Sequence, residues 1–166
     1  MTTESDYTIR LAGLADLDTV IELCEMGHEE NAIFSLSPEK YQRRIIEAIS
    51  TPVQWQEITT EAKNTFSCVI LAEKDGHGAG IVVLNGGSQW YSDDQMLFDI
   101  FNFVAPEHRR SDCAKRLVEF SKSVADQIGL PLLFGVLSTT RTEAKLRLYR
   151  RQMTLVGGFF LHVPPE

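Results

Sequence analysis

The sequence lacks a long apolar run, a cysteine framework and a histidine cluster. No apolar run approaches the roughly 20 residues that cross a bilayer, and the opening stretch MTTESDYTIR has no basic region followed by an apolar one. The 3 cysteines form no close pair, and the 4 histidines lack the short spacing of metal ligands. We therefore expect a cytoplasmic protein with no metal, no disulfide framework and no membrane partner.

Positive charge is scarce and unevenly placed. The formal net charge is -7, but residues 1–105 carry 6 Lys/Arg against 17 Asp/Glu, whereas residues 106–166 carry 10 against 6. The basic part indicates an anionic ligand, and the acidic part suits a cationic or amine ligand. Solvated helix faces would explain the same charges. A pI near 5.1 disfavours nucleic acid as a partner.

Apolar periodicity and turn residues give the order of the elements. The 166 residues fit a single domain, 1–166, without repeats or linkers. An Asp-Gly pair in KDGHG predicts a hairpin, and Ser37-Pro38 is a typical helix start. The first helix is expected to end near Met26. Expected strands cover 7–12, 66–73, 79–85, 96–104, 132–138 and 154–163, with helices beginning near 16, 37, 114 and 141.

This alternation predicts an α/β (α+β) chain with a mixed sheet. The long helix that begins near 114 would connect strand 96–104 to strand 132–138 as a parallel crossover.

Three stretches resemble the GNAT superfamily of N-acetyltransferases. FVAPEHRRSDCAKRL resembles its acetyl-CoA signature, V-x-P-x-x-R-x-x-G-x-G/A, and LRLYRRQMTLVGGFF resembles its C-terminal signature. IRLAGLADLDTVIELCEMGHEE resembles its first strand and helix, so the similarity covers essentially the whole chain. HEENAIFSLSPEKYQ is also similar to small stand-alone members found in bacteriophages and prophages. The resemblance implies a mostly antiparallel twisted sheet of six to seven strands, flanked by about four helices.

The strand-to-helix turn after Val104 is the expected cofactor site. A helix that starts near Arg109 leaves its first N–H groups without partners, and a phosphate suits such an end. With the resemblance, this implies that acetyl-CoA, as co-substrate, is bound by Phe103, Val104, Arg109, Arg110, Ser111, Asp112, Cys113, Ala114 and Lys115. The alternative is an Asp-capped helix with solvated arginines that binds nothing.

The resemblance also implies catalytic roles. Tyr149 stands in the LY of the C-terminal signature, and a phenol can protonate a departing thiolate. Asp99 lies inside an apolar strand, where a carboxylate either faces a wet cleft as the base or forms a structural ion pair. The backbone N–H of Val104 would be the oxyanion donor.

The acceptor is expected near the end of the first helix, where the family builds that site. The residues proposed to bind it are His28, Glu29, Glu30 and Asn102, with Asn31 beside them. Carboxylates there would suit a cationic amine, whereas a polar helix end explains the same residues structurally. The acceptor would be an amine on a small molecule or a peptide, and the oligomeric state stays open between a monomer and the homodimer common in this family.

Two functions from different classes follow. The first is an acetyl-CoA-dependent N-acetyltransferase that acts by direct transfer through a ternary complex. The second is a catalytically silent protein of the same fold that binds CoA or a protein partner as an adaptor or inhibitor. The departures that favour the second are Thr142, Lys145, Met153, Thr154 and Asp112, the last of which occupies a glycine position of the signature.

Overall fold

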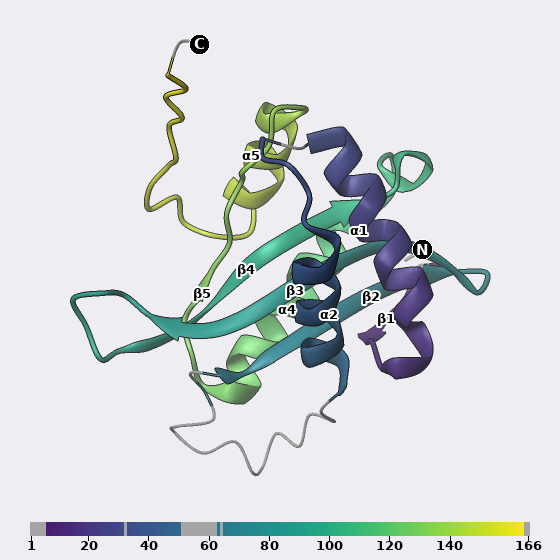
Figure 1. Cartoon of the computed structure of the whole chain (residues 1–166), viewed down its shortest axis with the longest axis horizontal. Coiled ribbons are helices and arrows are strands. Elements are labelled where there is room, and N and C mark those ends of the chain that lie inside the picture. The colour runs from purple at the N-terminus through teal and green to yellow at the C-terminus, as the bar shows by residue number, and fades with distance from the viewer. Residues whose placement is uncertain (1–5, 32, 51–62, 64, 165–166) are drawn as a thin grey trace.

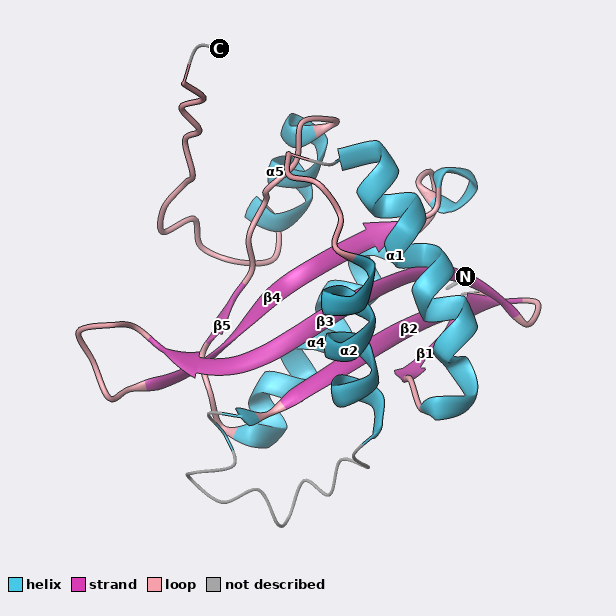
Figure 2. Ribbon diagram, in the orientation of Figure 1, coloured by secondary structure: helices cyan, strands magenta, loops and turns pink. Residues whose placement is uncertain are grey.

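One five-stranded sheet carries the helices on its two faces (Figures 1 and 2). The structure, a computed structural model, describes residues 6–31, 33–50, 63 and 65–164. In chain order the elements are β1 (Thr8–Leu11), η1 (Leu14–Asp16), α1 (Leu17–Asn31), α2 (Pro38–Ser50), β2 (Ser67–Lys74), β3 (His77–Ser88), β4 (Gln95–Val104), η3 (Pro106–His108), α4 (Cys113–Ile128), β5 (Leu132–Leu133) and α5 (Thr142–Arg150).

The sheet is mixed and mostly antiparallel, as the sequence predicts. Its order is β1-β2-β3-β4-β5, and β5 alone pairs in parallel, with β4. The parallel crossover through α4 is therefore confirmed. The described residues form five strands, so the expected count of six to seven is not confirmed. Residues 154–163 form no strand, because no strand lies beside them to pair with. Their apolar side chains are exposed, and that of Phe160 fully so.

The hairpin between β2 and β3 forms where the Asp-Gly pair predicts it. Lys74 faces His77 across the turn, and Asp75 and Gly76 have φ angles of 52° and 77°. Two successive positive φ values give a turn whose twist matches that of the flanking strands. Glycine and aspartate adopt this conformation more readily than most residues, so this turn sets the register of β2 and β3, the two most buried strands.

Helices α1 and α2 cover one face of the sheet, and α4 covers the other (Figure 1). The α1–α2 face buries Val20 and Leu23 against Ile81 of β3. On the opposite face, Leu117 and Val124 of α4 pack on β2, β3 and β4. One face of β4 therefore lies toward α1 and α2 and the other toward α4, so each side chain of that strand belongs to one of these two layers.

Helix α1 is longer than the sequence predicts. It continues past the expected end at Met26 to Asn31. Gly27 allows this, because a Cβ there would lie 2.5 Å from the Phe101 ring and 2.9 Å from the Phe103 ring. Gly27 is thus the point where α1 packs closely on β4. As a result, the residues expected in a loop lie in the last turns of a helix.

All three cysteines are buried and free, as expected for reduced thiols. Burial raises the pKa of Cys24, Cys68 and Cys113 to about 12. Across the described ranges there is no cluster of three or more potential metal ligands. No helix in those ranges is both long enough and apolar enough to cross a membrane.

Candidate active site

Strands β4 and β5 run together for two residues and then diverge. Leu97 pairs with Leu132 and Phe98 with Leu133, whereas β4 continues to Val104. A bulge at Ile100 bends β4 just beyond the last pair, since Leu84 of β3 faces Asp99 and Val83 faces Phe101. The β5-side edge of β4 is therefore free of strand pairing beyond Phe98.

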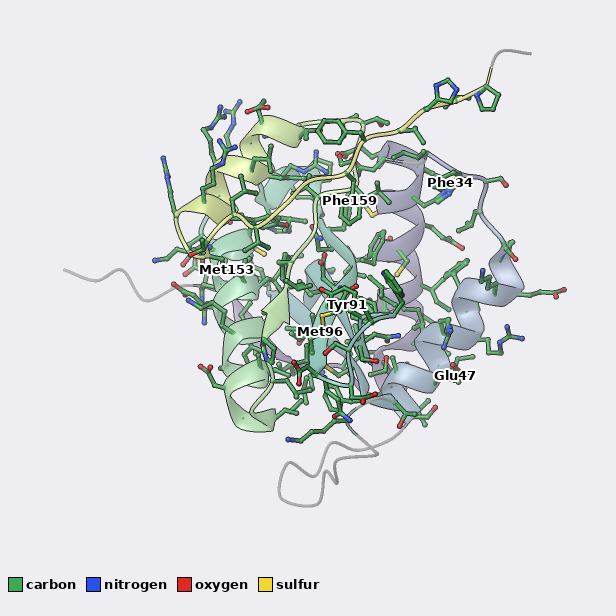
Figure 3. All side chains as sticks on the ribbon, turned by 90° about the vertical axis from the view of Figure 1, so that its left-hand side faces the viewer. Phe34, Glu47, Tyr91, Met96, Met153 and Phe159 are labelled. Carbon is green, nitrogen blue, oxygen red and sulfur yellow. The ribbon has the colours of Figure 1, made fainter. Side chains whose placement is uncertain are left out.

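A cleft of about 1180 Å³ opens along this divergence. Its walls come from the end of α1, the start of α2, β4, the chain from β5 to Ser138, and α5. The segment from Met153 to Phe159 forms a further wall. Figure 3 faces this side of the molecule, with Met96 of β4 between α2 and α4, and Phe34 and Phe159 above it.

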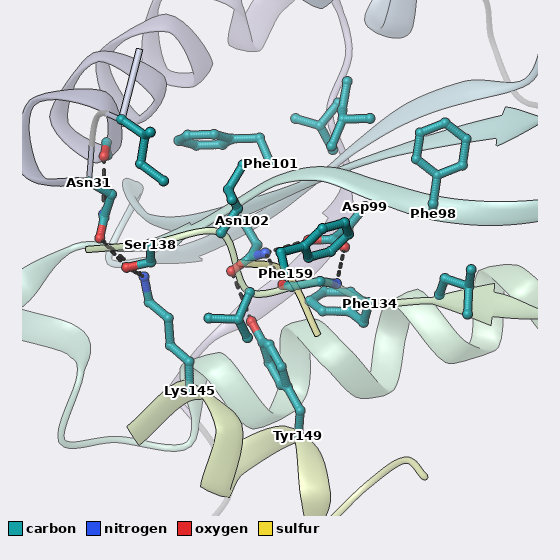
Figure 4. A pocket seen from close by; sticks show the side chains of 18 of the residues that line it. Asn31, Phe98, Asp99, Phe101, Asn102, Phe134, Ser138, Lys145, Tyr149 and Phe159 are labelled. Atoms are coloured by element: carbon teal, nitrogen blue, oxygen red, sulfur yellow. Dashed lines mark hydrogen bonds between the residues drawn. The ribbon is translucent and has the colours of Figure 1, made fainter. Parts of the chain in front are cut away.

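Tyr149, Asn102 and Asp99 form a hydrogen-bonded chain in the cleft (Figure 4). The Tyr149 hydroxyl donates to Asn102 Oδ1 at 2.8 Å, and Asn102 Nδ2 donates to Asp99 Oδ2. The backbone N–H of Gly135, next to β5, donates to the other Asp99 oxygen. The structure thus brings together the two predicted catalytic residues and Asn102, which was predicted to bind substrate.

Burial perturbs the acidity of both ends of this chain. Desolvation raises the pKa of Asp99 to about 6, although hydrogen bonds from Gly135 and Asn102 oppose the shift. Desolvation, and then the charge of Asp99, raise the pKa of Tyr149 above its usual value. Near neutral pH the site therefore holds a carboxylate that is mostly ionised but more basic than usual, and a phenol that keeps its proton. This combination suits one proton acceptor and one donor.

Packing holds Tyr149 in place. Its ring meets that of Phe134 edge to face, with centroids 5.0 Å apart. Phe134 follows β5 directly, so the helix that carries the tyrosine is attached to the diverging strand.

The backbone of Val104 faces the open side of β4. The N–H of Ala105 donates to Ala79 of β3, and backbone groups point to alternate edges along a strand. The N–H and C=O of Val104 are therefore directed away from β3, toward the side on which β4 and β5 separate. Arg109 Nε donates to the Val104 carbonyl at 2.9 Å, which agrees with this direction. Val104 does not line the cleft that holds Tyr149 and Asp99, so its role as oxyanion donor stays a prediction.

Arg109 contacts protein groups rather than solvent. Its guanidinium donates to Glu30 of α1 at 2.5 Å, and it lies 5.5 Å from the centroid of the Phe103 ring. Only 16% of its side chain is exposed. The arginine of the signature therefore connects α1 to the end of β4.

The remaining residues that were expected to bind the cofactor lie in the turn before α4 and in the first turn of that helix. Arg110, Ser111, Asp112 and Lys115 are exposed, whereas Cys113 is buried and could offer only its backbone. Ala114, the last residue of the expected set, is partly buried in the first turn of α4.

The expected alternative of an Asp-capped helix is wrong. Asp112 occupies the N-cap position, but its side chain makes no capping hydrogen bond. Instead, the Cys113 N–H donates to the Ser111 hydroxyl at 3.1 Å. The other part of that alternative, solvated arginines, is also wrong for Arg109, which is largely buried.

The residues expected to bind the acceptor separate into two groups. His28 lines the cleft, with Nε2 3.0 Å from the Phe34 carbonyl oxygen, and Asn31 and Asn102 line it too. Glu29 is exposed, and Glu30 is bound to Arg109; neither lines the cleft. Burial has the largest single effect and opposes ionisation of Glu30, but the hydrogen bonds from Arg109 and Thr140, together with the charges of Arg109 and Lys145, outweigh it and lower the pKa of that carboxyl.

A polar cluster that the sequence did not predict lies beside the catalytic chain. Lys145 of α5 donates to Ser138 at 2.9 Å and to Asn31 at 3.3 Å, and Figure 4 shows these three side chains together. Thr140 donates to Asn31 at 2.7 Å. Burial lowers the pKa of Lys145. The one available signal was Lys145 itself, a charged residue on the helix that carries Tyr149.

Comparison with solved structures shows that this chain shares the fold of N-acetyltransferases. No family model and no curated protein matches the sequence. The aminoglycoside acetyltransferase meta-AAC0020 from an uncultured soil metagenomic sample superposes with a TM-score of 0.66 at 14% identity, covering 97% of this chain and 96% of that one.

Two further structures show the same architecture. The ribosomal-protein-alanine N-acetyltransferase from Brucella melitensis biovar Abortus 2308 matches with a TM-score of 0.66 at 14% identity, covering 96% of this chain and 99% of that one. AAC(6')-Iy, solved with a bisubstrate analog of CoA and monomethyl-acetylneamine, gives 0.68 at 13% identity, covering 97% and 99%. At these identities the likeness establishes the fold.

Proposed function

We propose that this protein is an N-acetyltransferase, which moves the acetyl group of acetyl-CoA directly to a primary amine in a ternary complex. The observation that carries the proposal is the Tyr149–Asn102–Asp99 chain, set in a cleft where β4 and β5 diverge. Acetyltransferase structures with the same fold, one of them solved with a CoA bisubstrate analog, support it.

The chain's own residues supply what the transfer needs. The amine nitrogen forms a bond to the thioester carbonyl carbon as the carbon–sulfur bond breaks. Asp99, directly or through a water molecule, accepts the proton that the amine loses. Tyr149 donates its proton to the departing thiolate. The Val104 N–H stabilises the negative charge that develops on the carbonyl oxygen.

The residues beside the cleft fit acetyl-CoA as the acetyl donor. The free edge of β4 offers backbone groups for an extended ligand arm to pair with. Beyond it, Arg110 and Lys115 are exposed around the N-terminal turn of a 16-residue helix, which suits phosphate groups. Asp112 must turn outward for a pyrophosphate to approach.

Calorimetric titration of the purified protein with acetyl-CoA, and in parallel with CoA, is the first test. We expect micromolar affinity for both, followed by release of CoA thiol when an amine is added. No binding at millimolar acetyl-CoA would contradict the proposal.

A second function is favoured by one observation. Asp112 stands exposed where the signature has glycine, and a carboxylate there opposes a pyrophosphate. A silent CoA-binding adaptor or inhibitor would bind CoA in the same titration but release no thiol with any amine.

A further inference from the structure

The charges that line the cleft are opposite to those expected for a polycationic acceptor. Within the described residues, the cleft is lined by four cationic side chains and one carboxylate, that of Asp99. The four cations are Lys40, Arg44, Lys145 and Arg150. A ligand with several ammonium groups would meet like charges here, and each such pair costs binding free energy.

The nearby carboxylates lie outside the lining of the cleft. Glu30 is bound to Arg109, and Glu29 is exposed outside the cleft. Glu25 accepts a hydrogen bond from the Tyr41 hydroxyl at 2.5 Å, and it too lies outside the lining. Of the two carboxylates that the sequence predicted for a cationic amine, Glu30 therefore pairs with Arg109 and Glu29 faces solvent.

Two of the four cations lie apart from the expected phosphate site. Lys40 and Arg44 are on α2, four residues apart and so on one face of that helix, and both are exposed. Arg44 forms an exposed ion pair with Glu47 at 3.5 Å, which the carboxylate of an acceptor has to replace. Helix α2 packs on the opposite face of the sheet from α4, whose first turn carries Arg110 and Lys115. Lys40 and Arg44 are thus placed for an anionic group on the acceptor rather than for the phosphates of CoA.

The wall between α2 and the first half of β4 is apolar. Aromatic and aliphatic side chains from three elements line it, and Phe34 stands 70% exposed at its rim. They are Phe34, Leu36, Tyr41, Met96, Phe98, Ile100 and Phe101. Such a wall suits an acceptor whose body is apolar.

We propose that the acceptor is an apolar amine that carries a carboxylate, of the kind found in a free hydrophobic α-amino acid, with the carboxylate held by Lys40 and Arg44. This inference rests on the proposed function for its amine acetylation step. It adds that the apolar body packs on the β4 aromatics, with the amine directed toward Asp99 and Tyr149. The charge of the lining disfavours polycationic amines.

Thiol release with saturating acetyl-CoA tests the proposal. The probes are L-phenylalanine, 2-phenylethylamine, which has the same body without the carboxylate, and spermidine as the polycation. We expect kcat/KM for phenylalanine to exceed that for phenylethylamine at least tenfold and that for spermidine at least a hundredfold. Equal values for the first two, or preference for spermidine, would overturn the proposal.

Variants locate the carboxylate site. Lys40→Gln combined with Arg44→Gln should lower kcat/KM for phenylalanine at least tenfold and change that for phenylethylamine by less than twofold. Arg43→Gln removes an exposed cation from the same helix outside the cleft and is the matched control. Equal losses for both amines, or for the control, would contradict the assignment.

Binding of the acetylated products separates this inference from the proposed function. Calorimetry with N-acetyl-L-phenylalanine and N-acetyl-2-phenylethylamine, in the presence of CoA, needs no turnover. Tighter binding of the first, lost in the double variant, upholds the carboxylate site even if no amine is acetylated. Equal binding, or binding of neither, overturns the site whatever the rate of thiol release.

Discussion

Tyr149 is the residue whose replacement separates chemistry from packing. Tyr149→Phe keeps the ring that packs on Phe134 and removes the hydroxyl that donates to Asn102. Loss of a general acid should lower kcat by about 10²-fold or more. Acetyl-CoA affinity should stay within about twofold, as measured by calorimetry beside steady-state thiol release. If affinity and kcat fall together, the tyrosine is a packing residue.

Asp99 gives a prediction for stability against pH. Its pKa is about 6 in the folded protein and 3.8 when unperturbed, so between these values the folded state binds the proton more tightly. The free energy of unfolding should therefore fall as pH rises from about 4 to about 6, and then level off. The contribution is about 2–3 kcal/mol.

Urea denaturation at pH 4, 5, 6 and 7 measures this effect. The wild-type protein should lose about 2–3 kcal/mol relative to Asp99→Asn between pH 4 and pH 7. The comparison is between the pH dependences of the two unfolding free energies. A constant loss of stability from the hydrogen bond that the variant disturbs therefore does not affect it. Parallel pH profiles for the two proteins would show that the carboxyl is not desolvated.

At the residue scale, the sequence predicts side chains that lie close together along one strand. Asp99 and Asn102 stand in a single apolar run, and their three-residue spacing made them candidates together. Glu30 and Arg109 are 79 residues apart, and no local pattern reports their contact. The same holds for Asn31 and Lys145, which are 114 residues apart. Such pairs form only in the folded chain, where α1 lies beside the β4–α4 turn and beside α5.

At the scale of elements, Arg109 joins α1 to the turn between β4 and α4. Arg109→Gln should leave Glu30 partly buried without its guanidinium and lower the unfolding free energy by about 1–3 kcal/mol. Arg110→Gln, on the exposed neighbour, should change stability by less than about 0.5 kcal/mol and weaken acetyl-CoA binding instead. Denaturant unfolding and calorimetry measure the two effects; the reverse pattern would place the phosphate contact on Arg109.

Elements with strong local signals were predicted closely, and the others were not. The hairpin at Asp75-Gly76 and helices α2 and α4 follow from turn residues, a proline start and an apolar stripe. The end of α1 was placed too early because Gly27 serves close packing rather than termination. Strand β5 was expected over seven residues but spans two, since its length is set by β4 bending away at Ile100.

At the scale of the molecule, the buried residues belong mainly to the sheet and its helices, and two segments outside them are exposed. Residues 155–163 and the 89–94 connection carry exposed apolar side chains, with Trp90 94% and Phe159 78% exposed. Extended exposed segments are cut before packed ones. We expect brief chymotrypsin treatment to cleave first in these two segments, as identified by mass spectrometry. First cuts inside α4 or β3 would contradict this order of stability.

The burial of the three cysteines bears on how the protein can be studied. A thiol inside the core, with its pKa raised to about 12, holds almost no reactive thiolate at neutral pH. Disulfide reagents that report a liberated coenzyme thiol by colour should therefore meet little background from the folded protein. The same reagents would report unfolding, since each cysteine becomes visible when the sheet opens, so one optical signal can follow both turnover and the integrity of the core.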